Sequence, residues 1–194
     1  MAKVTKATVW IVESLEFSDE NRRKEGEIIS RTLGLSGKRT EYTYLRTRKE
    51  LEAFVKEFGN SVHRYLHVSC HGYTGEFHTT TDMIPALEFA KILAPHVNKR
   101  RVFLSTCLAA DDGFAEALLS KSTCLSVLGP AGTINFDDAA IFWSAFYHLM
   151  FKDSSDSMHH KTIEKSAGQC AKLVGEQFRL FYRKGRKVAS KLLG

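Results

Sequence analysis

The amino-acid sequence predicts an α/β protein with three layers, in which helices cover both faces of a mostly parallel sheet of about five strands. Two observations carry this prediction. Short apolar segments alternate along the chain with segments whose apolar residues recur every three or four positions, which is the pattern of strands joined by helical crossovers. In addition, two of the apolar segments end abruptly in reactive side chains, as strands do at the carboxyl edge of a parallel sheet.

These patterns predict five strands and six helices. The strands are residues 7–12, 40–44, 64–71, 102–106 and 124–128. The helices are residues 19–33, 51–58, 85–93, 114–119, 139–151 and 162–182. Polar and less polar residues alternate in the second strand, which is typical of an edge strand. Thr47 and Glu50 form a capping-box pattern ahead of the second helix, and apolar residues recur at helical spacing from 163 to 181.

The chain has the size and composition of one domain, residues 1–194. Of its 194 residues, 43% are apolar and 26% are charged, which is ordinary for a globular protein. The N-terminus lacks the apolar core of a signal peptide. The most apolar segment, residues 139–151, is 13 residues long, whereas a membrane-spanning helix needs ~20. We therefore expect a buried helix there and no transmembrane segment.

The net charge of +6 is concentrated at the C-terminal end of the chain. Six of the 28 Lys and Arg residues lie in residues 177–194, which hold no acidic residue, so 22 basic residues face 22 acidic ones in the rest. We expect residues 178–194 to form a basic C-terminal helix or tail. Such a segment could bind nucleic acid, anionic lipid or an acidic partner. Cations are also favourable at the C-terminal end of a helix, and we prefer this explanation. Binding of nucleic acid by this segment is then not expected, although the charge leaves it open.

The four cysteines lie far apart in the sequence. They are Cys70, Cys107, Cys124 and Cys170. Because they show no close pairing and two fall in expected buried strands, we expect all four to be reduced, which suits a cytoplasmic location.

A histidine and a cysteine end two successive strands. His71 follows Leu-His-Val-Ser-Cys, and Cys107 follows Phe-Leu-Ser-Thr 36 residues later, which is the length of one strand–helix–strand unit. Neighbouring parallel strands share one carboxyl edge, so we expect the two side chains to meet there. An imidazole favours the reactive thiolate, and the backbone N–H of Gly72 could face an oxyanion. These are the parts of an acyl-transfer site; the alternative is that both residues are structural.

Cys70, directly before His71, is a weaker candidate. Adjacent residues of a strand point to opposite faces, so Cys70 is expected to be buried when His71 faces the cleft. A zinc site formed by Cys70, His71 and Cys107 would need all three to converge from one face, and no CxxC-type pair supports it. No metal or other cofactor is expected.

These two segments resemble the paired motifs of caspase-like cysteine peptidases, most closely those of the CHAT type, which is related to separase and to caspases. The likeness continues through Val-Leu-Gly-Pro-Ala-Gly-Thr at 127–133 and into the next helix, and it covers roughly residues 62–151. The resemblance implies a three-layer caspase-like sandwich. It also implies that His71 and Cys107 form a catalytic dyad, and that the backbone N–H groups of Gly72 and Cys107 bind the oxyanion.

The same resemblance implies an activity. The chain would be a cysteine endopeptidase that cleaves a protein partner in a prokaryotic defence or cell-death pathway, with any activating or regulatory protein supplied as a separate chain. Two other classes of function stay open. One is a catalytically silent caspase-like module that binds proteins, and the other is a flavodoxin-like or receiver-like domain. A receiver needs an acidic cluster after the first strand, where Glu13 stands alone.

Three aspartates are candidates for the pocket that receives the substrate residue before the scissile bond. Asp111 and Asp112 follow Cys107 closely, and Asp82 lies beyond His71. A carboxylate in that pocket would select Arg or Lys through charge pairing. The alternative is that these residues cap the helices that follow them.

Overall fold

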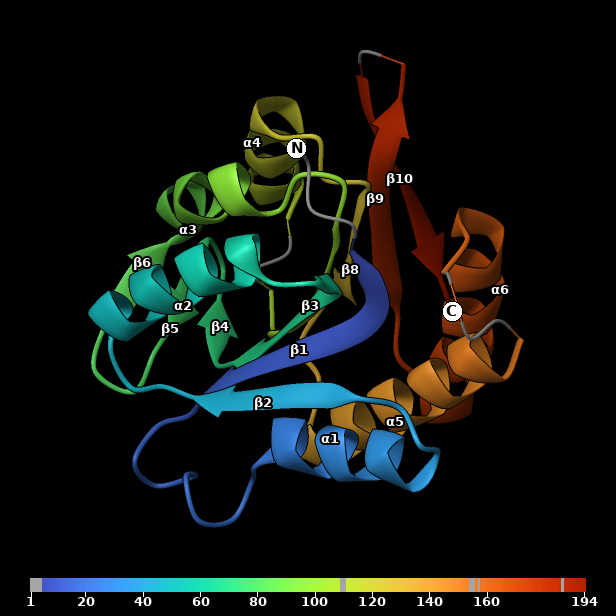
Figure 1. Cartoon of the computed structure of the whole chain (residues 1–194), viewed down its shortest axis with the longest axis horizontal. Helices are drawn as coiled ribbons and strands as arrows, with labels where there is room; N and C mark the ends of the chain where they lie inside the picture. Colours follow the sequence, from blue (N-terminus) through green and yellow to red (C-terminus); the bar gives the residue numbers. More distant parts are fainter. Residues whose placement is uncertain (1–4, 109–110, 154–155, 157, 186) are drawn as a thin grey trace.

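A seven-stranded sheet forms the centre of the molecule (Figure 1). The computed structural model describes residues 5–108, 111–153, 156, 158–185 and 187–194. Across the sheet, the strands lie in the order β10 (Lys187–Leu193), β9 (Phe178–Lys184), β8 (Ser126–Pro130), β7 (Arg101–Ser105), β3 (His63–Cys70), β1 (Lys6–Ser14) and β2 (Thr40–Tyr44). The five strands from β8 to β2 are parallel and correspond to the five predicted strands. β9 and β10 add an antiparallel edge.

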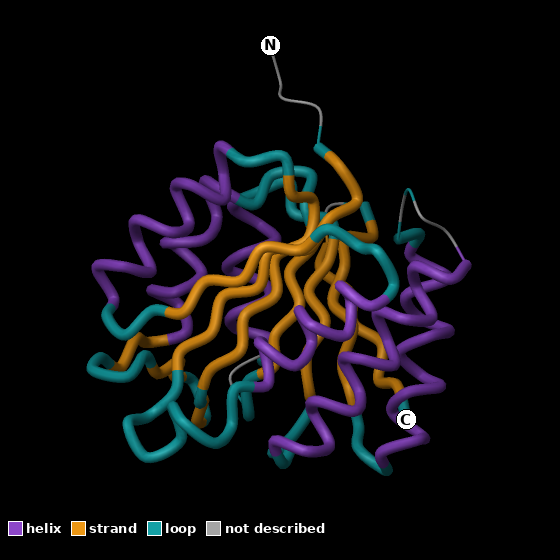
Figure 2. The backbone as a smooth tube through the Cα atoms, turned by 60° about the horizontal axis from the view of Figure 1, so that its bottom comes forward, coloured by secondary structure: helices purple, strands orange, loops and turns teal. Residues whose placement is uncertain are grey.

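Helices cover both faces of this sheet, which confirms the predicted α/β class with three layers (Figure 2). One face carries α1 (Glu25–Leu35), α5 (Phe136–Asp153) and α6 (His160–Val174). The other carries α2 (Arg48–Asn60), α3 (Ala86–Leu93), the short 3-10 helix η1 (Ala94–His96) and α4 (Asp112–Lys121). A small second sheet of β4 (Gly72–Tyr73), β5 (Glu76–His78) and β6 (Met83–Pro85) follows β3.

Alternate residues of the central strands enter two separate hydrophobic cores. In β3, Tyr65 packs against the α1, α5 and α6 layer, whereas Leu66 and Val68 pack against α2, α3 and α4. The apolar segment expected to be a buried helix is α5, whose inner residues are fully buried: Phe142, Trp143, Phe146, Tyr147 and Met150. Within the described ranges, none of the helices combines the length and apolar character that crossing a membrane requires.

The structure corrects the expectation of a basic helix or tail over residues 178–194, because β9 and β10 are two antiparallel strands that pair with each other. α6 ends at Val174 because Gly175 adopts a left-handed backbone with φ of 75°, which favours glycine. β9 then pairs with β8, and β10 with β9. Phe178 is fully buried and its ring stacks on that of Phe142, with centroids 3.5 Å apart.

Three of the cations in these two strands contact other parts of the protein. Arg179 pairs with Asp112 at 3.2 Å, Lys191 pairs with Glu164, and the Arg183 guanidinium donates to the carbonyl of Leu119. Arg186, which also contributes to the charge of this segment, lies outside the described residues.

Candidate active site

Strand register brings His71 and Cys107 to neighbouring positions. β3 and β7 are parallel, and their last paired residues are Ser69 and Ser105. The register continues one step further, because the Cys70 thiol lies 3.6 Å from the Thr106 hydroxyl. His71 and Cys107 occupy the next position on each chain. Adjacent strands are about 4.8 Å apart, so the two residues follow the same edge of the sheet side by side.

Both side chains belong to the sheet face that is covered by α1 and α5. Residues alternate along a strand, and Tyr65 in β3 and Phe103 in β7 point to this face. His71 and Cys107 have the same parity as these two residues. The segment at the start of α5 contacts both of them, because Ile134 binds Cys107 and Phe136 packs on His71.

The Cys107 thiol is held by the backbone of Ile134. Its sulfur donates to the Ile134 carbonyl at 3.4 Å and accepts from the Ile134 N–H at 3.3 Å. The next residue, Leu108, has a positive φ of 54°, a conformation that is uncommon for a residue with a side chain. The chain therefore turns sharply at the end of β7, and Cys107 is left half-buried at the turn.

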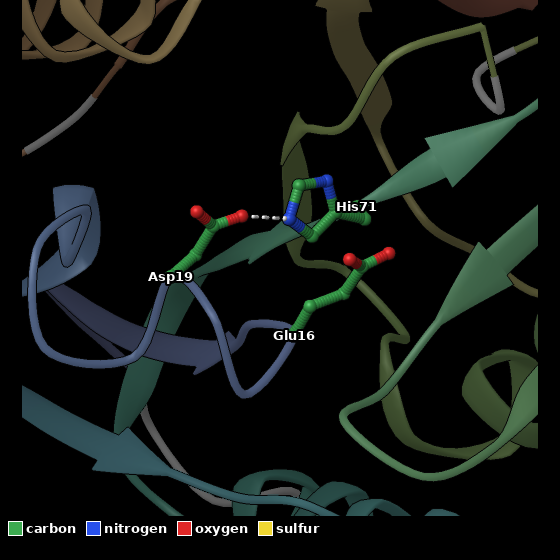
Figure 3. A group of neighbouring side chains, drawn as sticks. All are labelled: Glu16, Asp19 and His71. Atoms are coloured by element: carbon green, nitrogen blue, oxygen red, sulfur yellow. Dashed lines mark hydrogen bonds and ion pairs between the residues drawn. The ribbon is translucent and has the colours of Figure 1, made fainter.

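Asp19 orients the imidazole of His71. Its Oδ2 lies 2.9 Å from His71 Nε2 (Figure 3). A carboxylate can only accept a hydrogen bond, so Nε2 carries the proton and Nδ1 is left as an acceptor. Phe136 packs edge-on against the imidazole, with ring centroids 5.3 Å apart. Arg23 lies over the Phe136 ring and 3.4 Å from Asp19 Oδ1, which closes the cluster around the histidine.

The sequence pattern did not reveal Asp19 as a site residue, because residues 19–33 were expected to form one helix. In the structure, α1 begins only at Glu25, and residues 16–24 form turns instead. These turns carry Asp19 from the end of β1 to the end of β3. Only the tertiary fold brings them together, and no local signal marks the contact.

Gly72 continues from His71 into the small sheet. The His78 N–H donates to the His71 carbonyl at 3.0 Å, so His71 and His78 form a hydrogen-bonded pair. Such pairs alternate with non-hydrogen-bonded ones in antiparallel strands. Gly72, which faces Phe77, is therefore in a non-hydrogen-bonded position. Its N–H points away from β5.

A cleft of about 540 Å³ lies beside the His71 cluster. Arg23 and Phe136, which surround the histidine, form part of its wall, and Arg22, Glu25, Asn135 and Asp137 also line it. The wall thus combines two guanidinium groups with an aromatic ring and two carboxyl groups.

The three candidate substrate-binding aspartates make contacts within the protein. Asp111 caps α4 by accepting from the Phe114 N–H at 2.7 Å. The Asp112 side chain is 78% exposed and pairs with Arg179 of β9. Asp82 accepts from the N–H of Arg48 at 2.9 Å, and this hydrogen bond lowers the pKa of its carboxyl. The expectation that Asp82 caps α3 was wrong, since Pro85 holds that position and Asp82 binds the first turn of α2.

Cys70 lies on the opposite sheet face from Cys107 and packs against the α2, α3 and α4 core. Burial raises the pKa of its thiol to about 12, so Cys70 is protonated at neutral pH. Cys70 and Cys107, like the other two cysteines, are free thiols in the structure.

One group of side chains near the site has the composition and spacing of metal ligands. Glu16, Asp19 and His71 each offer a ligand atom, and these atoms lie within 4.8 Å of one another (Figure 3). A bound cation would compete with the hydrogen bond between Asp19 and His71. Glu16 is exposed, whereas Asp19 and His71 are largely buried.

Comparison with known proteins gives a structural neighbour. No protein-family model matches the chain, and no curated protein sequence is similar to it. Among solved structures, the crystal structure of caspase-1 from Spodoptera frugiperda is similar, with a TM-score of 0.55 and 12% sequence identity. The match covers 88% of this chain and 79% of the insect protein. At this level of identity the similarity concerns architecture, and it shows that the chain has a caspase-like fold.

Proposed function

We propose that this protein is a caspase-like cysteine endopeptidase in which Cys107 is the nucleophile and His71 is the base. The observation that carries the proposal is the register of β3 and β7, which pairs Ser69 with Ser105 and brings Cys70 near Thr106, one residue before His71 and Cys107. The bond between Asp19 and His71 supports it further, because it leaves Nδ1 free to accept a proton.

The reaction begins when Cys107 leaves the Ile134 carbonyl and gives its thiol proton to His71 Nδ1. The thiolate attacks the peptide carbonyl carbon, and the oxyanion that forms is held by the backbone N–H groups of Gly72 and Cys107. The C–N bond then breaks, and the leaving amine takes the proton from His71. His71 next deprotonates a water molecule, which attacks the thioester and releases the acid and the Cys107 thiolate. Asp19 stabilises the imidazolium in both halves of the reaction.

The proposed substrate is a protein partner. A preference for cleavage after Arg or Lys rests mainly on Asp112, because Asp111 and Asp82 each bind a helix N-terminus. An exposed ion pair such as that between Asp112 and Arg179 is worth little, so a substrate cation could replace Arg179. Profiling a peptide library with wild type and Asp112→Asn tests this: loss of the preference in the variant supports it, and equal turnover of basic and apolar residues in the wild type contradicts it.

The cellular setting follows from the chemistry and from the sequence resemblance. A free thiol at the site suits a reducing, cytoplasmic location, which we propose for this protein. The resemblance to CHAT-type peptidases supports a role in prokaryotic defence or cell death, with a separate protein as activator. Release of Cys107 from Ile134 is a step that such an activator could promote.

A second candidate function is a catalytically silent module that binds proteins. The observation that favours it is that Ile134 engages the Cys107 sulfur both as donor and as acceptor, so the thiol is occupied in this conformation.

A peptide acyloxymethyl ketone probe separates the two candidates, because only an activated thiol reacts with it rapidly. We expect the wild type to be labelled at Cys107, and Cys107→Ala to fold normally and remain unlabelled. Cys70→Ala is the matched control; it should be labelled like the wild type, although loss of buried volume would cost about 1 kcal/mol. A folded wild type that resists labelling would support the silent module, and labelling at Cys70 would overturn the assignment of the nucleophile.

A further inference from the structure

A buried carboxyl group links the two strands that carry the candidate dyad. Glu25, the first residue of α1, is 3% exposed. The Ser105 hydroxyl donates to its Oε2 at 2.9 Å. The Ser69 hydroxyl lies 3.4 Å from the same oxygen and 3.3 Å from Glu13 Oε1, so the two carboxyl groups share its single hydrogen. Ser69 and Ser105 are paired across β3 and β7, two residues before His71 and Cys107. Glu25 therefore spans the two strands directly beneath the candidate catalytic pair.

Two buried carboxyl groups share this region, and their surroundings differ. Glu13 in β1 is fully buried and accepts from the Gly26 N–H and the Tyr42 hydroxyl, each at 2.7 Å. Among the described residues, the donors to Glu25 are the Ser105 hydroxyl and the Ser69 hydroxyl, and the latter is shared with Glu13. Burial raises the pKa of both groups; for Glu25 it reaches about 8, with the neighbouring charge of Glu13 as a further cause. Glu25 therefore holds a proton at neutral pH, whereas the hydrogen bonds to Glu13 from Gly26 and Tyr42 oppose the effect of burial on its pKa.

Two uncharged side chains, His67 and Tyr147, and a cleft lined by two arginines complete the surroundings of Glu25. Oε1 of Glu25 lies 3.9 Å from Nε2 of His67, and neither atom has a hydrogen-bond partner among the described residues. Burial lowers the pKa of His67 to about 3 and raises that of Tyr147, which binds His67 Nδ1 at 2.9 Å, so both are uncharged. Arg22 and Arg23 line a cleft that Glu25 lines as well. Among the described residues, however, neither arginine forms an ion pair with the Glu25 carboxyl group, whose nearest basic partner is His67.

We propose that Glu25 is a positioning residue, whose carboxyl group bridges Ser69 and Ser105 and so fixes the spacing of His71 and Cys107. This inference rests on the proposed function. Ionisation of Glu25 would set a second negative charge beside Glu13 in a buried site, and the bridge would loosen. Glutamine has the same shape as a protonated glutamate and cannot ionise, whereas alanine removes the bridge.

The kinetic test compares Glu25→Gln and Glu25→Ala with the wild type between pH 6 and 9.5, with peptide cleavage as the readout. We expect kcat of the wild type to fall as pH rises through about 8, and Glu25→Gln to lack this fall. Glu25→Ala should lose about tenfold or more in kcat with KM nearly unchanged, since misplacement of reacting groups by about 1 Å costs up to a hundredfold. Glu27→Gln, in the same turn of α1 but paired with Arg31 at the surface, is the matched control and should behave as wild type.

A second measurement does not depend on activity. Because the pKa of Glu25 is higher in the folded than in the unfolded state, its contribution to stability is complete below about pH 4.5 and is lost as pH rises to about 8. Chemical unfolding of Cys107→Ala with and without Glu25→Gln should show this loss only where Glu25 is present. If the wild type does not cleave peptides but the pH dependence of unfolding still differs with and without Glu25→Gln, the proposed function is refuted and the bridge formed by Glu25 is not. Identical pH dependence with and without Glu25→Gln, or equal loss of kcat in the Gln and Ala variants, would overturn the role of Glu25.

Discussion

At the scale of single residues, the two nitrogens of His71 have different tasks. Nε2 is bound to Asp19, and Nδ1 is the nitrogen left to take the thiol proton. The Phe136 ring packs against the His71 imidazole, and the Arg23 guanidinium pairs with the Asp19 carboxylate, so both groups of the hydrogen bond are held in position. Asp19 is thus bound to the candidate base, whereas the Cys107 sulfur is bound to the backbone of Ile134.

Replacing Asp19 by Asn tests this arrangement. The amide keeps the shape but loses a charge-assisted hydrogen bond, which is worth about 1.5–3 kcal/mol. We expect kcat to fall by at least about tenfold while KM stays nearly constant, as measured in steady-state assays. Glu16→Gln is the matched control, since Glu16 is exposed and should leave kcat within about twofold. Equal effects of the two substitutions would remove Asp19 from the orienting role.

The site residues that the sequence could suggest are those that end strands. His71 and Cys107 each follow an apolar run, and this local pattern was enough to predict that they share an edge. Asp19 and Glu25 carry no such pattern. Asp19 lies in a turn whose position depends on where α1 begins, and Glu25 looks like an ordinary acidic residue in the first turn of a helix until β3 and β7 bury it.

At the scale of elements, helix termini account for two of the three candidate specificity residues. Asp111 caps α4, and Asp82 binds the first N–H of α2, next to the capping box formed by Thr47 and Glu50. Four N–H groups at each helix start lack partners within the helix, so a nearby carboxylate is readily used there.

The cap of α4 gives a stability prediction. Asp111→Ala should lower the free energy of unfolding by about 1 kcal/mol, because the Phe114 N–H loses its acceptor, whereas Asp111→Asn should cost only a few tenths. Urea unfolding measures both. The neighbouring Asp112→Ala is the control, with an expected change within about 0.5 kcal/mol. A larger effect at Asp112 than at Asp111 would contradict the assigned cap.

The last helix shows where periodicity misleads. Residues 163, 167, 170, 174, 178 and 181 are apolar at spacings of three and four, so a single helix to about 182 was predicted. Its first part is correct, but Gly175 ends α6, and Phe178 and Leu180 alternate into the sheet as strand residues. Apolar residues three positions apart fit a helix, but they also fit a strand in which two adjacent residues, here Leu180 and Phe181, are both buried. Gly175 is the one sequence feature that marks the end of the helix before the strand.

At the scale of the whole molecule, the C-terminal pair of strands is part of the common core. Phe178 stacks on Phe142 of α5, and β9 covers β8 along its length. Phe178→Ala should therefore lower the free energy of unfolding by about 3–5 kcal/mol, within one cooperative transition measured by urea and followed by two optical probes. Leu192→Ala, at a half-exposed position of β10, should change it by less than about 0.5 kcal/mol. Two separate transitions would mean that this pair of strands folds on its own.

The backbone hydrogen bond from the Ala131 N–H to the Gln177 carbonyl, at 2.8 Å, affects the order in which the parts of the site form during synthesis. During synthesis β3 and β7 emerge early, so His71 and Cys107 can meet before the last strands exist. The segment that holds the Cys107 thiol lies just after Ala131; it is bound to Leu108 and Cys107 on one side, and it gains its bond to Gln177 only when the residue before β9 arrives. Until then β8 is an open edge, and the loop around the thiol has no anchor on that side. The site therefore takes its final shape only after Gln177 and β9 have left the ribosome and paired with Ala131 and β8.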